Sequence, residues 1–307
     1  MDKLFLLDAY ALIYRAYYAF IKNPRINSKG MNTSAVMGFV NTLHEVITKE
    51  QPTHLGVAFD PAGPTFRHEA YPEYKAQREA CPEDIKRSVP VIKEVLKAFR
   101  IPVLEISGYE ADDVIGTLAT QAGQLGIDTY MLTPDKDYGQ LVQPHVFMFR
   151  PRYGDAGYET LGVDEIEQKY DIATPLQVID LLGLMGDAAD NIPGCPGVGE
   201  KTAIKLIKQF GSIDHLLEST AELKGALKKK IEENRQQIAF SKFLATIKTD
   251  VPVKLNLDEL KLAAPNEPEL RRIFDELEFK SFADRILNKT EKKPKPANTQ
   301  LDLFAEN

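Results

Sequence analysis

KLFLLD, residues Lys3 to Asp8, is a short apolar run that ends in an acidic side chain. The same pattern returns in HLGVAFD, residues 54–60, and in TYMLTPD, residues 129–135. Brief aliphatic runs bounded by polar or turn residues are typical of buried strands. We therefore expect five strands, at Lys3–Asp8, His54–Asp60, Ile101–Ile106, Thr129–Thr133 and Val146–Phe149.

Amphipathic segments lie between these runs. Apolar residues recur with helical spacing in Ser34–Glu50, Glu83–Arg100 and Glu110–Leu125. Such alternation of strands and helices predicts an α/β fold with a mostly parallel sheet covered on both faces. After about Gly162 the pattern becomes almost wholly helical. We expect an α/β core at residues 1–161, a helical region at 162–287 and a Lys- and Pro-containing tail at 288–307.

The composition is that of a folded protein. The chain has 307 residues, of which 43% are hydrophobic and 27% charged, and this excludes a disordered or collagen-like chain. Cys81 and Cys195 are too few for a disulfide framework. The N-terminal run contains Asp2, Asp8 and Arg15 and does not resemble a signal peptide. No run approaches the roughly 18 apolar residues of a membrane span. We expect a cytoplasmic protein.

The acidic residues are concentrated near the ends of the expected strands. In an open parallel sheet these strand ends meet at one edge, where ligands bind. A helix that begins near Glu110 should reach the same edge, and Asp187 and Asp190 have a spacing that puts both on one face of a helical turn. The acidic set is Asp8, Asp60, Glu110, Asp112, Asp113, Asp135, Asp137, Asp187 and Asp190.

Each of these acids alone is readily explained as a helix cap or a solvated charge. Nine together would repel one another unless cations neutralised them. Oxygen ligands without His or Cys favour Mg²⁺ or Mn²⁺, and two such ions are the usual apparatus for in-line phosphoryl displacement. The overall charge of −7 argues against a nucleic-acid binder, but without the nine acids the balance is 45 − 9 = 36 acidic against 38 basic residues.

Two further segments carry charge next to aromatic or glycine residues. FRHEAYPEYKAQR contains Phe66, Arg67, Tyr71, Tyr74, Lys75 and Arg78. This mixture suits single-stranded nucleic acid, and it equally suits a solvated loop with anchoring aromatics. GCPGVGEKTA includes Gly197, Val198, Gly199, Lys201 and Thr202, and Lys205 follows it. Glycines before a helix start form an anion site, although such turns are often only structural. Arg15 fits either a phosphate contact or a salt bridge.

Four strings carry a family resemblance: residues 66–78 (FRHEAYPEYKAQR), 108–119 (GYEADDVIGTLA), 133–142 (TPDKDYGQLV) and 183–203 (GLMGDAADNIPGCPGVGEKTA). Together they closely resemble the 5′-3′ exonuclease (5′ nuclease) domain of bacterial DNA polymerase I, in the flap endonuclease superfamily. The similarity runs from Lys3 to about Leu287. It implies a PIN-like core, an arch at about residues 62–88 and a helix-three-turn-helix element for duplex DNA at about residues 180–235.

The resemblance also implies roles for single residues. Asp8, Asp60, Glu110, Asp112 and Asp135 match the first metal site, and the remaining four acids match the second. Lys75 and Arg78 match basic arch residues at the scissile phosphate, and Arg15 matches a basic position near the first acid. The segment Gly197–Lys201 matches the duplex-binding turn, where relatives often hold K⁺. A polymerase domain in cis would normally follow.

The tail contains a short motif. Gln300, Leu301, Asp302, Leu303 and Phe304 resemble the peptide that bacterial replication proteins insert into the sliding clamp, and an ordinary interdomain linker is the alternative.

The sequence therefore predicts a two-metal 5′ nuclease that cleaves nicked, 5′-overhang or flap DNA, as in removal of RNA primers, nick translation and repair. Two alternatives remain open: a PIN-type ribonuclease and a non-catalytic DNA-binding module.

Overall fold

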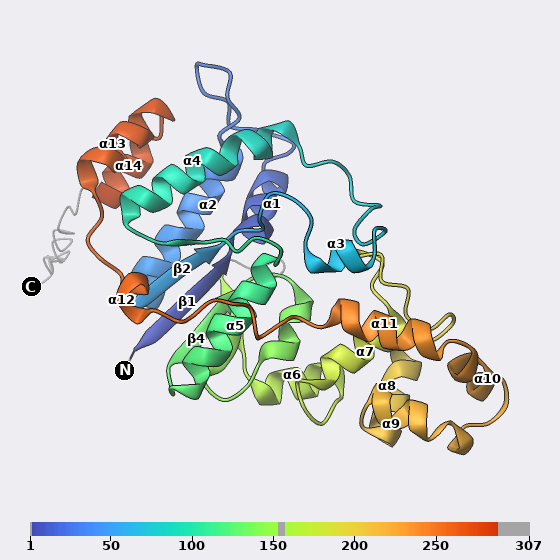
Figure 1. The fold of residues 1–307 in the computed structure, drawn as a ribbon. Coiled ribbons are helices and arrows are strands. Elements are labelled where there is room, and N and C mark those ends of the chain that lie inside the picture. Colours follow the sequence, from blue (N-terminus) through green and yellow to red (C-terminus); the bar gives the residue numbers. More distant parts are fainter. Residues whose placement is uncertain (1, 153–156, 288–307) are drawn as a thin grey trace, which may run out of the picture.

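The computed structural model describes residues 2–152 and 157–287 (Figure 1). One six-stranded sheet has the order β3-β2-β1-β4-β5-β6. All neighbours are parallel except β5 and β6, which are antiparallel. The strands are β1 (Lys3–Asp8), β2 (His54–Ala58), β3 (Val103–Leu104), β4 (Asp128–Leu132), β5 (Val146–Pro151) and β6 (Tyr158–Leu161). The expected mostly parallel sheet is confirmed.

The edge strands differ from the expectation. β3 keeps only two residues of Ile101–Ile106, because it pairs only with β2 and only at Val103 and Leu104. β6 was missed, since its alternation is short and follows a Gly-containing loop. The central strands agree closely, because they are buried on both faces and read as continuous apolar runs.

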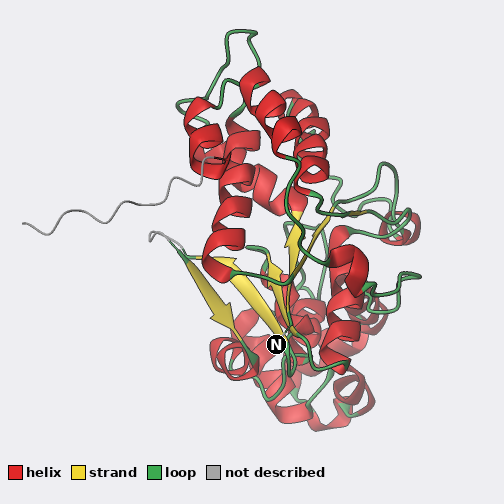
Figure 2. Ribbon diagram, turned by 90° about the vertical axis from the view of Figure 1, so that its left-hand side faces the viewer, coloured by secondary structure: helices red, strands yellow, loops and turns green. Residues whose placement is uncertain are grey.

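Helices cover both faces of the sheet (Figure 2). On one face, β1 contributes Phe5 and Leu7 to a core shared with the N-terminal helices, and on the other face it contributes Leu4 and Leu6 to a core shared with α5 and the later helices. The helices of the first face are α1 (Ala9–Ala19), α2 (Ser34–Glu45) and α4 (Glu83–Phe99). The short helix α3 (Phe66–Ala70) precedes α4, and α5 (Ala111–Gln124) lies on the other face. The predicted helix Ser34–Glu50 ends as a π-helical turn, η1 (Val46–Glu50).

The second half is helical, as expected. The 3₁₀ helix η2 (Lys136–Leu141) lies between β4 and β5. The elements after β6 are α6 (Val163–Tyr170), α7 (Gln177–Met185), α8 (Glu200–Phe210), α9 (Ile213–Glu218), η3 (Thr220–Glu222), α10 (Gly225–Glu233), α11 (Arg235–Ala245), α12 (Leu257–Leu260), α13 (Glu267–Glu276) and α14 (Lys280–Leu287).

The last two helices return to the first core and do not extend the helical region. Leu270, Ile273 and Phe274 of α13 are buried in the cluster that holds Leu96 and Phe99 of α4. Figure 1 shows α13 and α14 beside α4, far from α8 to α10. The apolar stripe of α13 explains this position, because the sheet-covering helices offer it an apolar partner. Within residues 2–152 and 157–287, no helix has the length and apolar character to cross a membrane.

Candidate active site

Carboxylates collect at the edge of the sheet where β1, β2 and β4 end. Asp8 ends β1, Asp60 follows β2, and Asp135 follows β4. β1 lies between β2 and β4, so the chain leaves β1 and its two neighbours toward the same edge. These three acids line a cleft of about 760 Å³ together with Glu110 and Asp112. The convergence expected from the strand ends is therefore present.

Asp8 lies at the centre of this edge. One carboxylate oxygen accepts the N–H of Ala11 and so caps α1, and the other accepts the hydroxyls of Thr133 and Tyr138. Burial, with a further contribution from Asp60, raises the pKa of Asp8 to about 7. The carboxylate of Asp60 accepts the N–H of Ala111, at the start of α5, and burial raises its pKa too. Both acids accept hydrogen bonds from neutral donors, and neither forms an ion pair with a cation among the described residues.

The start of α5 supplies three more carboxylates. Glu110 is the N-cap of the helix, and Asp112 and Asp113 lie in its first turn. Each of the three offers an oxygen, and these oxygens lie within 4.8 Å of one another. Burial and the neighbouring Asp113 raise the pKa of Asp112 well above its usual value. An acidic N-terminus of this kind is favoured by the helix dipole, so the local sequence stabilises both the helix and the cluster.

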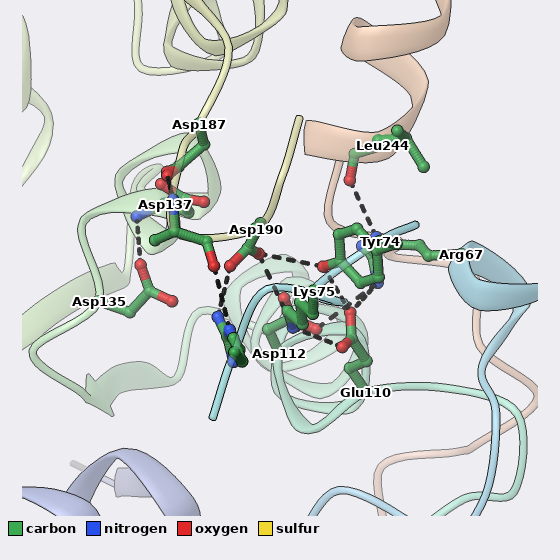
Figure 3. Close-up of polar contacts among 12 residues, drawn as sticks. Arg67, Tyr74, Lys75, Glu110, Asp112, Asp135, Asp137, Asp187, Asp190 and Leu244 are labelled. Atoms are coloured by element: carbon green, nitrogen blue, oxygen red, sulfur yellow. Dashed lines mark hydrogen bonds and ion pairs between the residues drawn. The ribbon is translucent and has the colours of Figure 1, made fainter. Parts of the chain in front are cut away.

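Arg67 was expected to contact DNA, but it is 1% exposed and lies inside the protein. Its guanidinium donates to both oxygens of Asp113 at 2.8 Å and to Glu110 at 2.8 Å. It also donates to the carbonyl of Leu244, as Figure 3 shows, and to that of Thr246. Asp113 accepts the N–H groups of Glu110 and Lys248 as well, so its two oxygens are fully engaged. Arg67 is an internal counter-ion here, and DNA cannot reach it.

Tyr74, Lys75 and Arg78, from the segment 66–78, contact the acids. Figure 3 shows Tyr74 and Lys75 next to Glu110. The Tyr74 hydroxyl donates to Glu110 and Asp190, and the ring is buried, which excludes it as an exposed stacking platform. Lys75 pairs with Glu110 at 2.5 Å, and Arg78 pairs with Asp190. Burial would raise the pKa of Glu110, yet the charges of Lys75 and Arg67 hold it below its usual value.

A second group of acids lies beside the first (Figure 3). Asp135 caps η2 by accepting the N–H of Asp137. One oxygen of Asp137, Oδ1, is buried without a hydrogen-bond partner. Burial and the neighbours Asp135 and Asp187 raise the pKa of Asp137 to about 8. Lys136 pairs with Asp187 at 2.8 Å, and Asp190 belongs to the loop that follows α7.

Other residues expected at the site lie elsewhere. Arg15 is exposed on α1 in a separate groove lined by Asn41, Glu45 and Lys49, and the cleft does not include it. Phe66 and Tyr71 are in a cluster of aromatic rings with Phe240 and Phe243 on α11 and Tyr109. None of Arg15, Phe66 and Tyr71 lines the cleft.

The loop that carries Asp187 and Asp190, which we call the acidic loop, continues through the Gly197–Lys201 turn into α8. Gly199 is the N-cap of α8, and Lys201 and Lys205 are exposed on that helix. Thr202 is half-buried in its first turn, and Gly197 has a φ of +73°, which favours glycine. Val198 is 4% exposed and packs in the core, so its side chain is unavailable to DNA. The tail motif at residues 300–304 lies outside the described residues.

Several side chains at the cleft were not expected. Tyr10, Tyr14 and Tyr18 lie along one face of α1 and line the cleft. Their i, i+4 and i+8 spacing was the signal that could have found them. Lys136 next to Asp135 was visible too, but its pairing with Asp187 joins segments about 50 residues apart, and local pattern does not show such pairs.

The donor set fits hard divalent cations. The acids gathered at the cleft offer carboxylate oxygens, which are the ligands that Mg²⁺ and Mn²⁺ prefer. Cys81 also lines the cleft, but in the described part of the chain the group of side chains close enough together to hold an ion consists of Glu110, Asp112 and Asp113. The orphaned Oδ1 of Asp137 and the raised pKa of Asp8 mark positions where negative charge lacks a partner. Carboxylates gathered at one sheet edge beside basic side chains form an α/β site that could hold divalent cations.

The comparisons with known proteins are specific. Residues 3–171 match the family model "5′-3′ exonuclease, N-terminal resolvase-like domain", and residues 173–268 match "5′-3′ exonuclease, C-terminal SAM fold". The chain therefore belongs to the 5′-3′ exonuclease family.

Relatives and structures agree with this assignment. DNA polymerase I of Bacillus caldotenax is 42% identical over 296 residues, and that of Bacillus subtilis is 43% identical over 286 residues. These matches cover 96% and 92% of the chain and 33% and 32% of the polymerases, so the chain spans about one third of the length of these relatives.

Two solved structures share the fold. The bacteriophage T5 D15 flap endonuclease, in a complex with DNA and metal ions, has a TM-score of 0.68 at 20% identity and covers 90% of this chain and 100% of its own. The catalytic core of Rad2 with a DNA substrate has a TM-score of 0.62 at 17% identity and covers 93% and 91%.

Proposed function

We propose that this chain is a divalent-metal-dependent 5′ nuclease that hydrolyses phosphodiesters of nicked, 5′-overhang or flap DNA. The observation that carries the proposal is the convergence of Asp8, Asp60, Glu110, Asp112 and Asp135 on one cleft. The DNA that the T5 and Rad2 structures contain supports the substrate class. By analogy with the polymerase relatives, removal of RNA primers, nick translation and repair are the proposed settings, with a polymerase domain in cis.

Two ions of Mg²⁺ or Mn²⁺ are proposed as cofactors. The cleft acids would hold the first, and Asp137, Asp187 and Asp190 would hold the second. Asp113 would complete the second site only if Arg67, which engages both of its oxygens, released one of them. Its oxygen lies within 4.8 Å of those of Glu110 and Asp112. When bound, such ions activate water and stabilise the charge of the phosphoryl transition state.

Basic side chains and backbone N–H groups of the chain would bind the DNA. Lys75 and Arg78 are the cations nearest to the acids, and they can exchange their carboxylate partners for the oxygens of a phosphodiester. The Gly197–Lys201 turn and the exposed Lys205 would hold the backbone of the duplex through N–H groups and charge. A bound K⁺ at this turn is part of the proposal.

The test is cleavage of a 5′-flap DNA with mapped product ends, with single-stranded RNA of the same sequence as the competing substrate. We expect cleavage of the flap DNA that stops in excess EDTA and in Asp135→Ala. Asp128→Ala is the matched control, because Asp128 is an acid at the opposite end of β4. Undiminished cleavage in EDTA contradicts the mechanism, and preferred cleavage of RNA supports the ribonuclease alternative.

The clamp motif needs a separate test. We propose that residues 300–304 bind the bacterial sliding clamp through Leu303 and Phe304. Changing both to Ala should abolish capture of the chain on immobilised clamp and leave flap cleavage unchanged. Equal capture of the variant ends the proposal.

A further inference from the structure

Helix α11 forms side-chain and backbone hydrogen bonds near both of its ends. The start of the helix contacts the segment that leads into α8, and its end contacts the α/β core. Near its start, the side chain of Gln237 donates to the carbonyl of Gly194 at 2.7 Å. One turn later, the fully buried hydroxyl of Ser241 accepts the N–H of Gly194 at 3.0 Å. Gly194 lies between the acidic loop and the Gly197–Lys201 turn. α11 therefore binds both backbone groups of the residue that joins these two segments.

The other end of α11 is bonded to the α/β core. Arg67 donates to the carbonyl of Leu244 at 3.0 Å and to that of Thr246 at 2.8 Å. Gln140 of η2 donates to the carbonyl of Ala245 and accepts the N–H of Ile247. Arg67 also pairs with Glu110, an acid of the cleft. Arg67 therefore contacts both the end of α11 and the cleft acid Glu110.

The flanks of α11 leave little room for movement. Phe243 packs on Phe66 with ring centroids 6.0 Å apart, and Phe240 packs on Tyr71 at 5.6 Å. On the other side, a Cβ at Gly183 of α7 would lie 3.0 Å from the backbone of Lys242, so the two helices are in close contact. Figure 1 shows α11 between α3, at the foot of the arch, and α10. Close-packed contacts of this kind transmit displacement and do not absorb it.

We propose that α11 is a strut that fixes the position of the duplex-contacting turn relative to the cleft, and so decides which phosphodiester is cut. Gln237 and Ser241 are its positioning residues, because they act on DNA only through Gly194. Neighbouring phosphates on one strand are about 3.4 Å apart along the helix axis, so a small displacement of the turn changes which phosphate reaches the acids. This inference rests on the proposed function.

The test is the double variant Gln237→Ala/Ser241→Ala on a flap substrate labelled at its 5′ end, with products resolved to single nucleotides. We expect metal-dependent cleavage to persist and duplex affinity to hold. The ratio of cuts at neighbouring phosphodiesters to the principal cut should rise about tenfold, since displacements of about 1 Å change rates by that order or more. Gln177→Ala is the matched control, because Gln177 donates to the carbonyl of Gly211 at 2.8 Å in the same region.

The outcomes separate the two proposals. A wild-type chain that shows no metal-dependent cleavage refutes the proposed function. A wild-type chain that cuts at one position, together with a folded double variant that cuts there with the same distribution, overturns the strut. A uniform loss of rate without a change of position also overturns it, because that is the signature of a merely structural role. Should circular dichroism show the double variant unfolded, Gln237→Ala alone is scored, since that side chain is only half-buried.

Discussion

The acid cluster has two sides, one at the start of α5 and one where β1 and β4 end. The protein treats the negative charge of these two sides in opposite ways. At the start of α5, Glu110 and Asp113 are paired with the protein's own cations, and the charges of Lys75 and Arg67 outweigh burial to hold the pKa of Glu110 low. At the ends of β1 and β4, burial raises the pKa of Asp8 to about 7 and that of Asp137 to about 8.

This difference assigns separate tasks to the two sides. Acids that pair with a cation of the protein keep their positions when no metal is bound. We call Glu110, Asp113 and their partner Arg67 the frame of the site. Acids that lack such a cation repel one another until an external cation arrives. The first group therefore stabilises the fold, and the second group costs stability in exchange for affinity toward metal. The predictions below test this comparison, from the largest expected effect to the smallest.

The largest effect should come from Arg67→Met. This change leaves Asp113, which is fully buried, and Glu110 without their shared cation. Breaking a buried ion pair from one side costs about 3–5 kcal/mol of unfolding free energy. Urea denaturation in EDTA measures it. Arg272→Met is the matched control, because Arg272 forms its ion pairs on the exposed face of α13, and little change is expected there. A loss no greater than in this control contradicts the frame role.

The opposite sign is expected for Asp137→Asn. An amide in place of the carboxylate removes the repulsion from Asp135 and Asp187 and supplies an N–H that can donate to them. We expect the metal-free protein to gain about 2 kcal/mol near neutral pH, while Mg²⁺ stabilises the variant less than the wild type. Thermal unfolding with and without Mg²⁺ measures both effects. A destabilised variant would show that Asp137 belongs to the frame.

The pH dependence follows from the same charges. Asp8 and Asp137 have folded-state pKa values near 7 and 8, above those of an unfolded chain, so the folded protein holds protons that the unfolded chain releases. Their contribution is complete below the unfolded pKa and is lost as pH rises through the folded values. Between about pH 5 and these folded values the metal-free protein should lose about 1 kcal/mol per pH unit for each responding group. Asp8→Asn should flatten this slope in EDTA, and an unchanged slope would assign it to other groups.

Much of the site could be predicted from sequence, and the reason is local. Asp8, Asp60 and Asp135 each follow an apolar run, and parallel strands must deliver their ends to one edge. Arg67 and Tyr74 could not be placed in this way. Arg67 lies in the short helix α3 and donates to the carbonyl of Leu244, which is 177 residues further along the chain. Tyr74 lies in the turn after α3, and its hydroxyl reaches Glu110 and Asp190, which are 36 and 116 residues away. Only tertiary contact reveals that a basic side chain faces inward.

The smallest effect should come from Lys136→Ala, and it tests whether the second side has any counter-ion of its own. Lys136 pairs with Asp187 at 2.8 Å, but its side chain is 49% exposed. Exposed pairs contribute little, so we expect a loss of about 0.5 kcal/mol in unfolding free energy in EDTA. The charge of Lys136 opposes the rise in the pKa of Asp137, so its removal should raise that pKa further. A loss in EDTA as large as that of Arg67→Met would mean that Lys136 is a frame cation, and the two sides would then be alike.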